Sequence, residues 1–261
     1  MKTVKIVSLA LIGSLVLFSC KKNATTTSET VINSEKELAL TETKPSDKTI
    51  SETYLYVTAS SGLSLRQYAN LSSEKLAVMP YGTRVKVITA EKNPTMKVGG
   101  IKGGMNEIEF NHKKGFAFNG FLSKYFPPER GAKAKFYAEE LIELFPEVKY
   151  VEAVGGTASK PSKTETLLLP NTEWYEAFYM AQQLFKIPKE FVFPLSTGKN
   201  NQTIVEKNLR KDSWTNELQI SRKDNELSKI EYVYKNKGFL KTVTITKEGS
   251  KMKLSRTEII E

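Results

Sequence analysis

Residues 60–88 read SSGLSLRQYANLSSEKLAVMPYGTRVKVI, and this stretch decides how the first half of the chain is expected to fold. In LSLR at 63–66 and in RVKV at 84–87, apolar side chains alternate with polar ones. A period of two is typical of a strand with one buried face. Gly62 and Gly82 stand just before these segments and allow turns with positive φ. The stretch therefore predicts short β-strands joined by tight turns.

The same pattern continues toward the C-terminus and the N-terminus. Three further segments look like strands: YLYVTA at 54–59, NEIEFN at 106–111 and KGFAFNGFL at 114–122. Turn signals separate them at Pro80–Gly82, Asn93–Pro94, Gly99–Gly100 and Gly103–Gly104. Short strands at this spacing indicate a small all-β barrel over residues 54–128. In its last strand, we expect Phe116 in the core and Gly115 at a tight bend.

The stretch 60–88 resembles the opening of bacterial SH3-like (SH3b, SH3 type 3) domains, with a G-L-x-[LV]-R core, a loop and a [PYK]-x-G-x-x-[VL]-x-V strand. NHKKGFAFNGFLSKY at 111–125 is similar to the closing strand of the same family. The resemblance implies a groove that binds cell-wall peptide, peptidoglycan or an envelope protein. Tyr68, Tyr81 and Phe118 are the candidates for lining this groove. Ordinary packing or simple exposure of these rings is the other interpretation.

The chain also departs from the family pattern in two places. GGMNEIEF at 103–110 has no tryptophan where the family commonly has one, so Met105 is expected in that packing position. EKNPTMKVGGIKGG at 91–104 is longer than a tight hairpin, and we expect it to extend as a loop beside the groove. Since aromatic side chains often line the groove of peptidoglycan-binding members, the missing tryptophan weakens any transfer of the family's ligand specificity.

The N-terminus carries a targeting signal. MKTVK is basic, and residues 6–18 are almost wholly apolar. This order is typical of a secretory signal, and the run is shorter than the about 20 residues that span a membrane. LFS at 17–19 followed by Cys20 resembles a bacterial lipobox, which implies that residues 1–19 are removed and that Cys20 carries acyl chains. An ordinary secretory signal with a chance cysteine and an uncleaved anchor are the alternatives.

Residues 20–53 are rich in Thr, Ser, Glu and Lys and contain no aromatic residue. Such a segment buries too little apolar area to fold, so we expect a flexible tether. The protein would then be held in the cell envelope by lipid at Cys20. Lys21 rather than Asp follows the cysteine, which by analogy with known lipoproteins favours the outer membrane, on its periplasmic face or at the surface.

The formal net charge is +10, and removal of Lys2 and Lys5 with the signal lowers it by two to +8. A basic protein outside the cytoplasm is drawn to anionic neighbours such as lipid headgroups, acidic polysaccharide and peptidoglycan carboxylates. Nucleic acid is not an expected partner in that compartment. Because the basic residues are interspersed with acidic ones, a general role in solubility is the other interpretation.

FPPERG at 126–131 contains two prolines, which mark a boundary. The second half of the chain comprises residues 129–261. KAKFYAEELIELFPEV at 133–148 predicts a helix whose buried stripe holds Tyr137, Leu141 and Leu144 and which ends near Pro146. VGGTASKPSKTE at 154–165 reads as a loop.

A second helix is predicted within residues 167–191. Asn171 or Thr172 is the expected cap, and the expected buried stripe comprises Trp174, Phe178, Ala181 and Phe185. Four strand candidates then follow: NELQISR at 216–222, LSKIEYVYK at 227–235, GFLKTVTITK at 238–247 and SKMKLSRTEII at 250–260. Two helices on one face of this antiparallel meander make an α+β domain. The whole chain is thus expected to be mixed, a small all-β SH3-like barrel followed by an α+β domain that resembles no family known to us.

The residue inventory excludes several chemistries. The chain has one cysteine and one histidine, so neither Cys–His nucleophilic catalysis nor a zinc site with several histidines can be built once Cys20 is acylated. His112 lies in a predicted turn and is read as solvated. We therefore expect no catalytic residue, no metal and no cofactor, and a binding protein rather than an enzyme.

Two other functions stay open. Glycosidic cleavage needs only two carboxylates, so an envelope hydrolase with its site in residues 131–261 is the alternative. The candidate glutamates on predicted helices are Glu139, Glu140, Glu143, Glu173 and Glu176. A third hypothesis is an assembly factor or inhibitor of another envelope enzyme.

Overall fold

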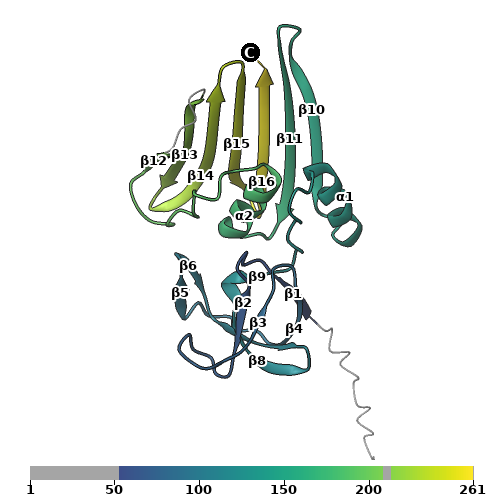
Figure 1. Ribbon diagram of the computed structural model, residues 1–261, viewed down its shortest axis with the longest axis vertical. Coiled ribbons are helices and arrows are strands. Elements are labelled where there is room, and N and C mark those ends of the chain that lie inside the picture. The colour runs from purple at the N-terminus through teal and green to yellow at the C-terminus, as the bar shows by residue number, and fades with distance from the viewer. Residues whose placement is uncertain (1–52, 208–212, 261) are drawn as a thin grey trace, which may run out of the picture. The chain divides into compact units, whose positions relative to one another are not determined.

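The structure is a computed structural model that describes residues 53–207 and 213–260 (Figure 1). These residues form two antiparallel seven-stranded sheets, one two-stranded ribbon and two α-helices. All of them belong to one compact unit, Ile50–Glu261. The mixed fold expected from the sequence is confirmed, and β-strands dominate it. Cys20, the signal and the tether up to residue 52 lie outside the described residues.

The first sheet is open. Its strand order is β3-β2-β8-β7-β4-β1-β9, with the bounds β1 Thr53–Val57, β2 Leu63–Arg66, β3 Lys75–Met79, β4 Arg84–Thr89, β7 Met105–Phe110, β8 Lys113–Phe118 and β9 Leu122–Ser123. The edge strands β3 and β9 do not pair, so the closed barrel expected from the sequence is not formed. A physical reason is that β9 has only two residues and is followed by prolines, which cannot donate to a ladder.

Residues 60–88 fold as the alternation of their apolar and polar side chains predicts. Leu63 and Leu65 are buried in β2, whereas Ser64 and Arg66 are half-buried on its other face. Gly62 and Gly82 have φ of +84° and +81°, which L side chains rarely adopt. The turns that start β2 and β4 therefore depend on these two glycines.

Two expectations for the last long strand, β8, are wrong. Phe116 is half-buried rather than in the core, because the period of two places Gly115 and Ala117 on the buried face. Gly115 is needed for a close approach between strands rather than for a bend. A Cβ added there would lie 2.6 Å from the carbonyl oxygen of Arg66 in β2.

Residues 91–104 form an ordered hairpin instead of the expected loop. Strands β5 (Met96–Val98) and β6 (Ile101–Gly103) pair across a turn at Gly99–Gly100, and Ile101 is buried. A 3₁₀ turn, η1 (Asn119–Phe121), holds the hairpin in place. The Asn119 Oδ1 accepts from the Gly104 N–H at 2.8 Å, and its Nδ2 donates to the Glu91 carbonyl at 3.2 Å.

The second sheet contains the predicted meander and three more strands. Its order is β10-β11-β16-β15-β14-β13-β12, with the bounds β10 Lys149–Thr157, β11 Lys160–Pro170, β12 Asn201–Val205, β13 Ser213–Lys223, β14 Glu226–Asn236, β15 Phe239–Glu248 and β16 Lys251–Ile260. The loop expected at 154–165 is wrong, since these residues form most of the β10–β11 hairpin. Pairing of β11 with β16 over nine residue pairs orders this polar, glycine-containing segment as strands.

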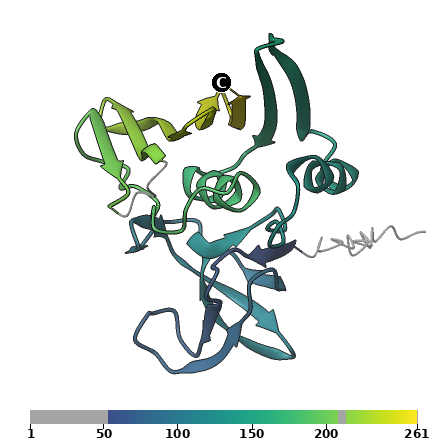
Figure 2. The same ribbon diagram turned by 45° about the horizontal axis from the view of Figure 1, so that its top comes forward.

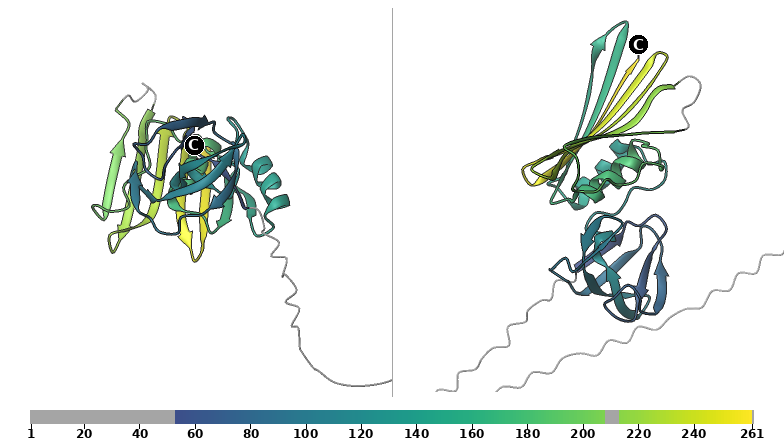
Figure 3. Two further views of the ribbon diagram at one scale, coloured as in Figure 1. Left: turned by 90° about the horizontal axis from the view of Figure 1, so that it is seen from below. Right: turned by 90° about the vertical axis from the view of Figure 1, so that its left-hand side faces the viewer.

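Both helices lie on one face of the second sheet, as expected (Figures 2 and 3). Helix α1 (Ala134–Leu144) lies against β10 and β11, and helix α2 (Trp174–Leu184) lies against β15 and β16. The side chains that point toward the helices are apolar and buried, among them Leu167, Leu218, Ile245 and Leu254.

Two details of the helices differ from the sequence-based expectation. Tyr137 and Leu141 are buried, but Leu144 is 62 % exposed, because α1 ends there and the chain turns into β10. The cap of α2 is Glu173 rather than Asn171 or Thr172. The Glu173 N–H donates to Oε2 of Glu176 at 2.8 Å, which satisfies one of the orphan donors at the helix start.

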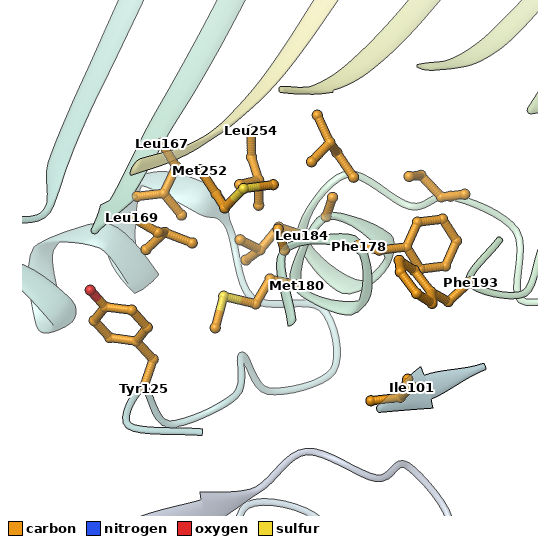
Figure 4. Close-up of a cluster of buried hydrophobic side chains, with 14 of the residues drawn as sticks. Ile101, Tyr125, Leu167, Leu169, Phe178, Met180, Leu184, Phe193, Met252 and Leu254 are labelled. Carbon is orange, nitrogen blue, oxygen red and sulfur yellow. The ribbon is translucent and has the colours of Figure 1, made fainter. Parts of the chain in front are cut away.

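Helix α2 supplies much of the hydrophobic core. Figure 4 shows Phe178, Met180 and Leu184 of α2 next to the sheet residues Leu167, Leu169, Met252 and Leu254. Phe178 and Phe185 of the predicted stripe are buried, which confirms the helical period. Trp174 is only half-buried, at the first turn.

Three tyrosine hydroxyls fix the segment that joins the two sheets. Tyr81 donates to the carbonyl of Pro128 at 2.9 Å, Tyr137 to that of Phe126 at 2.7 Å, and Tyr125 to that of Pro170 at 2.9 Å. The Phe126 ring also packs edge-on against Tyr137 at a centroid distance of 5.4 Å. These bonds occur at the boundary inferred at residues 126–131. The division between residues 128 and 129 stays a prediction.

Candidate functional site

The structure brings together two of the three aromatic residues proposed for a ligand groove. Tyr81 and Phe118 both line a hollow of about 470 Å³. Tyr68 lies in the loop between β2 and β3, is 60 % exposed, and does not line this hollow. Tyr81 and Phe118 are therefore candidates for contacting a ligand in this hollow, and Tyr68 is not.

Tyr81 stands at the centre of a longer groove. A second hollow of about 980 Å³ adjoins the first, and both are lined by Ser60, Tyr81, Gln183 and Lys189. We call these two hollows together the Tyr81 groove. The first sheet lines one side of it, and α2 with its following loop lines the other. Residues 126–140, which include the first turns of α1, line the larger hollow.

Local sequence explains how Tyr81 is held. The turn Pro80–Gly82 projects its side chain from the end of β3, and the positive φ of Gly82 completes the turn. The hydroxyl donates to the Pro128 carbonyl, and burial raises the pKa of Tyr81 to about 12. Tyr81 is therefore a neutral, positioned ring rather than an acid–base group at physiological pH.

Part of the wall from the first sheet is apolar. Phe118 lies at the end of β8 and is buried, and its ring packs edge-on against Phe121 at a centroid distance of 5.6 Å. Leu63 and Met105 complete this wall. Met105 is buried and contributes a flexible thioether to the groove.

The wall from α2 and its following loop carries amides and one exposed apolar side chain. The Gln182 Nε2 donates to the carbonyls of Pro188 and Phe191, both at 3.0 Å, and so fixes the loop that follows the helix. Gln183 makes no side-chain hydrogen bond within the part of the chain that the structure describes. Val192 is 68 % exposed and lines the groove.

The charges along the groove favour a ligand with some anionic character. Arg66 lines the smaller hollow, and Lys189 lines both. The larger hollow adds Arg130 and Lys133, set against Glu129 and Glu140. Cations thus outnumber carboxylates over the whole groove.

The groups proposed for other chemistries lie elsewhere or are engaged. His112 is in the β7–β8 turn, with a φ of 62°, and lines a separate hollow beside Arg84 and Glu109. Within the described residues, no group of three or more His, Cys, Asp or Glu side chains is arranged to hold a metal ion.

The five helical glutamates are not gathered into one site. Of them, only Glu140 lines the Tyr81 groove. Glu176 is buried, and burial raises the pKa of its carboxyl group while the bond from the Glu173 N–H opposes that shift. Its contacts are those of a group that stabilises the start of α2.

Sequence reasoning missed the groove residues of the second half, namely Gln182, Gln183, Lys189, Phe191 and Val192. The periodicity of α2 indicates only which of its side chains face its own sheet. The strongest available signal was the run KIPKEFVF at 186–193, in which Ile187, Phe191, Val192 and Phe193 follow the end of the helix within a loop.

Comparison of the chain with protein-family models, with curated proteins and with solved structures finds no match.

Proposed function

We propose that this chain is a lipid-anchored protein of the bacterial cell envelope that binds an extended peptide in the Tyr81 groove without catalysing a reaction. The lipobox-like residues around Cys20 motivate the anchor, and residues 20–53 would act as the tether. The peptide would be a cell-wall stem peptide or a segment of an envelope protein, which share backbone amides and carboxylates.

The observation that carries this proposal is the composition of the groove. A groove that joins aromatic side chains, the side-chain amide of Gln183 and basic side chains matches an extended peptide, whose backbone both donates and accepts hydrogen bonds. Gln183 is available for such bonds, and Lys189 and Arg66 suit peptide carboxylates. The SH3-like resemblance is supported by the short antiparallel strands and by the turns at Gly62 and Gly82.

A pull-down with purified peptidoglycan and a titration with soluble stem peptides test the proposal, using the full-length protein in detergent micelles. We expect retention that weakens as salt is raised, because cations line the groove. Val192→Asp should weaken binding about tenfold, since it places a carboxylate against an anionic ligand. Val205→Asp is the matched control, because Val205 is 53 % exposed on β12 and does not line the groove.

Equal binding by wild type, Val192→Asp and Val205→Asp would count against the groove. Release of soluble saccharides from the wall material would favour the carboxylate hydrolase instead. Co-purification of a stoichiometric envelope protein without wall binding would favour the assembly-factor hypothesis.

The anchor has a separate test. Cys20→Ser should move the protein from the detergent phase to the aqueous phase on phase partitioning and leave the fold unchanged, since acyl chains supply the membrane affinity. If the variant partitions like the wild type, the lipid anchor is wrong whatever the groove binds.

A further inference from the structure

A separate hollow of about 520 Å³ lies on the helix-facing side of the second sheet, beyond the end of α2. Residues 186–190 form one wall, and β13, β14 and β15 form the other. The side chains that matter here are Lys186, Glu190, Glu206, Asn216, Tyr234 and Lys241. It shares no lining residue with the Tyr81 groove.

Strand register explains why this hollow is polar. Leu218, Tyr232 and Val243 are neighbours across β13, β14 and β15, and all three are buried. Two residues further along the same strands, the row on the same face is Asn216, Tyr234 and Lys241. The change from apolar to polar falls where α2 has ended, so this polar row is not part of the core.

Asn216 is the first sign that the hollow receives a ligand. Its Oδ1 is buried and has no hydrogen-bond partner among the described residues, and the same holds for Oδ1 of Asn236. A buried acceptor without a donor costs folding free energy, and native proteins rarely retain one without a reason. Asn216 lines the hollow, and a rotation of its side-chain amide would bring Oδ1 to a donor of a bound molecule.

Tyr234 and Lys241 retain unused hydrogen-bonding capacity. The Tyr234 hydroxyl accepts from Ser213 Oγ at 3.1 Å and from Asn236 Nδ2 at 3.3 Å, which leaves its own O–H to donate. The Lys241 Nζ donates to the carbonyls of Phe185 at 3.3 Å and Lys186 at 3.2 Å, which leaves one of its three N–H groups.

The charges indicate a neutral ligand. Lys186 and Lys241 balance Glu190 and Glu206 around the hollow. The lysines donate hydrogen bonds and the glutamates accept them, so a matching ligand must both accept and donate hydrogen bonds. Hydroxyl groups do this, whereas a phosphate only accepts and an ammonium only donates. The half-buried Tyr234 ring adds an apolar surface for a C–H face.

We propose that this hollow binds a neutral saccharide through its hydroxyl groups, with Asn216 as a central contact. The site goes beyond the peptide groove, and neither depends on the other. The volume of the hollow, about 520 Å³, lies within the range of small-molecule sites.

The test uses the full-length protein in a sugar-free detergent and three probes: cellotriose, maltotriose and tri-N-acetylchitotriose. Saturation-transfer NMR and calorimetry should detect at least one of them. Asn216→Leu should weaken that binding about tenfold or more, and should also raise the urea midpoint because the orphan acceptor is removed. A merely structural asparagine would instead lower the midpoint.

Two further variants keep the test decisive. Tyr234→Phe removes only a hydroxyl and should weaken binding severalfold even if Asn216→Leu folds poorly. Asn201→Leu on β12 is the matched control and should bind as the wild type does, since Asn201 lies outside the hollow. Absence of binding to all three sugars at about 10 mM would overturn the proposal. So would unchanged binding by both hollow variants, or preferential binding of inorganic phosphate or glycine.

Discussion

The hydroxyl group of Tyr125 donates a hydrogen bond of 2.9 Å to the carbonyl oxygen of Pro170, which ends β11 immediately before α2. Tyr125 is fully buried just after β9, so this bond ties the end of the first sheet to the entrance of α2. Thr172 Oγ1 also donates to that carbonyl, at 3.4 Å.

Tyr125→Phe should lower the free energy of unfolding by about 1–2 kcal/mol, because the Pro170 carbonyl stays buried with one long bond. Urea denaturation of the full-length protein measures the loss. Tyr68→Phe is the control and should change stability by less than about 0.5 kcal/mol, since that ring is exposed. Equal effects of the two variants would show that the Tyr125 hydroxyl contributes nothing specific.

The position at which α1 ends gives a second prediction. Leu141 is fully buried and Leu144 is exposed, although both fit the stripe expected from the sequence. Leu141→Ala should cost about 2–4 kcal/mol through lost burial and a cavity, and Leu144→Ala less than about 0.5 kcal/mol. Chemical denaturation midpoints distinguish the two, and similar losses would contradict the position of the helix end.

Arg222 is expected to resist even a conservative replacement. It is buried, and its guanidinium donates twice to the Leu195 carbonyl, once to that of Lys199 and once to Gln202 Oε1. Lysine cannot reproduce this fork, so Arg222→Lys should destabilise the protein by about 2–3 kcal/mol. Arg130→Lys, in the Tyr81 groove, is the control that should be nearly neutral. A stable Arg222→Lys protein would mean that water replaces these bonds without loss.

Lys241 should make stability depend on pH in the alkaline range. Burial lowers its pKa to about 8, with Arg256 and Lys186 acting in the same direction and Glu258 opposing them. Between about pH 8 and the ordinary pKa of lysine, Lys241 is protonated in the unfolded state but has lost its proton in the folded state. Stability contributed by this group therefore rises with pH across that window.

The measurement is the urea midpoint of wild type and Lys241→Met at several pH values from 8 to about 10. The difference between the two proteins should change in favour of the wild type as pH rises, and the titration of the tyrosines cancels in that difference. A difference independent of pH would show that Lys241 keeps an ordinary pKa.

Much of the strand pattern could be predicted because it depends on local alternation. Leu63 and Leu65 face inward as their spacing indicates, and the four strands from β13 to β16 were found from the same signal. Gly62 and Gly82 could be assigned to turns because positive φ is a property of the residue type.

The rest depends on contacts between distant segments. The β10–β11 hairpin contains Gly155, Gly156 and Pro161, which locally indicate a loop, and it becomes sheet because β11 pairs with β16. The groove was half predicted: Tyr81 and Phe118 came from a family resemblance, whereas Gln183 and Val192 reach the groove only through the packing of α2 beneath the second sheet. The exposure of Tyr68 could not be predicted from the local sequence either, since an aromatic side chain in a loop can face the core or the solvent.

Because the walls of the Tyr81 groove come from residues 58–121, 126–140 and 179–192, a molecule seated there would touch segments that unfolding pulls apart. Because a ligand that binds only the folded state stabilises it, occupancy of the groove can be detected as an increase in stability, even when the partner is not known. A ligand at one hundred times its Kd raises the free energy of unfolding by about 2.7 kcal/mol. Melting temperature thus becomes a screening signal for wall fragments, and the Val192→Asp protein supplies the baseline against which each shift is judged.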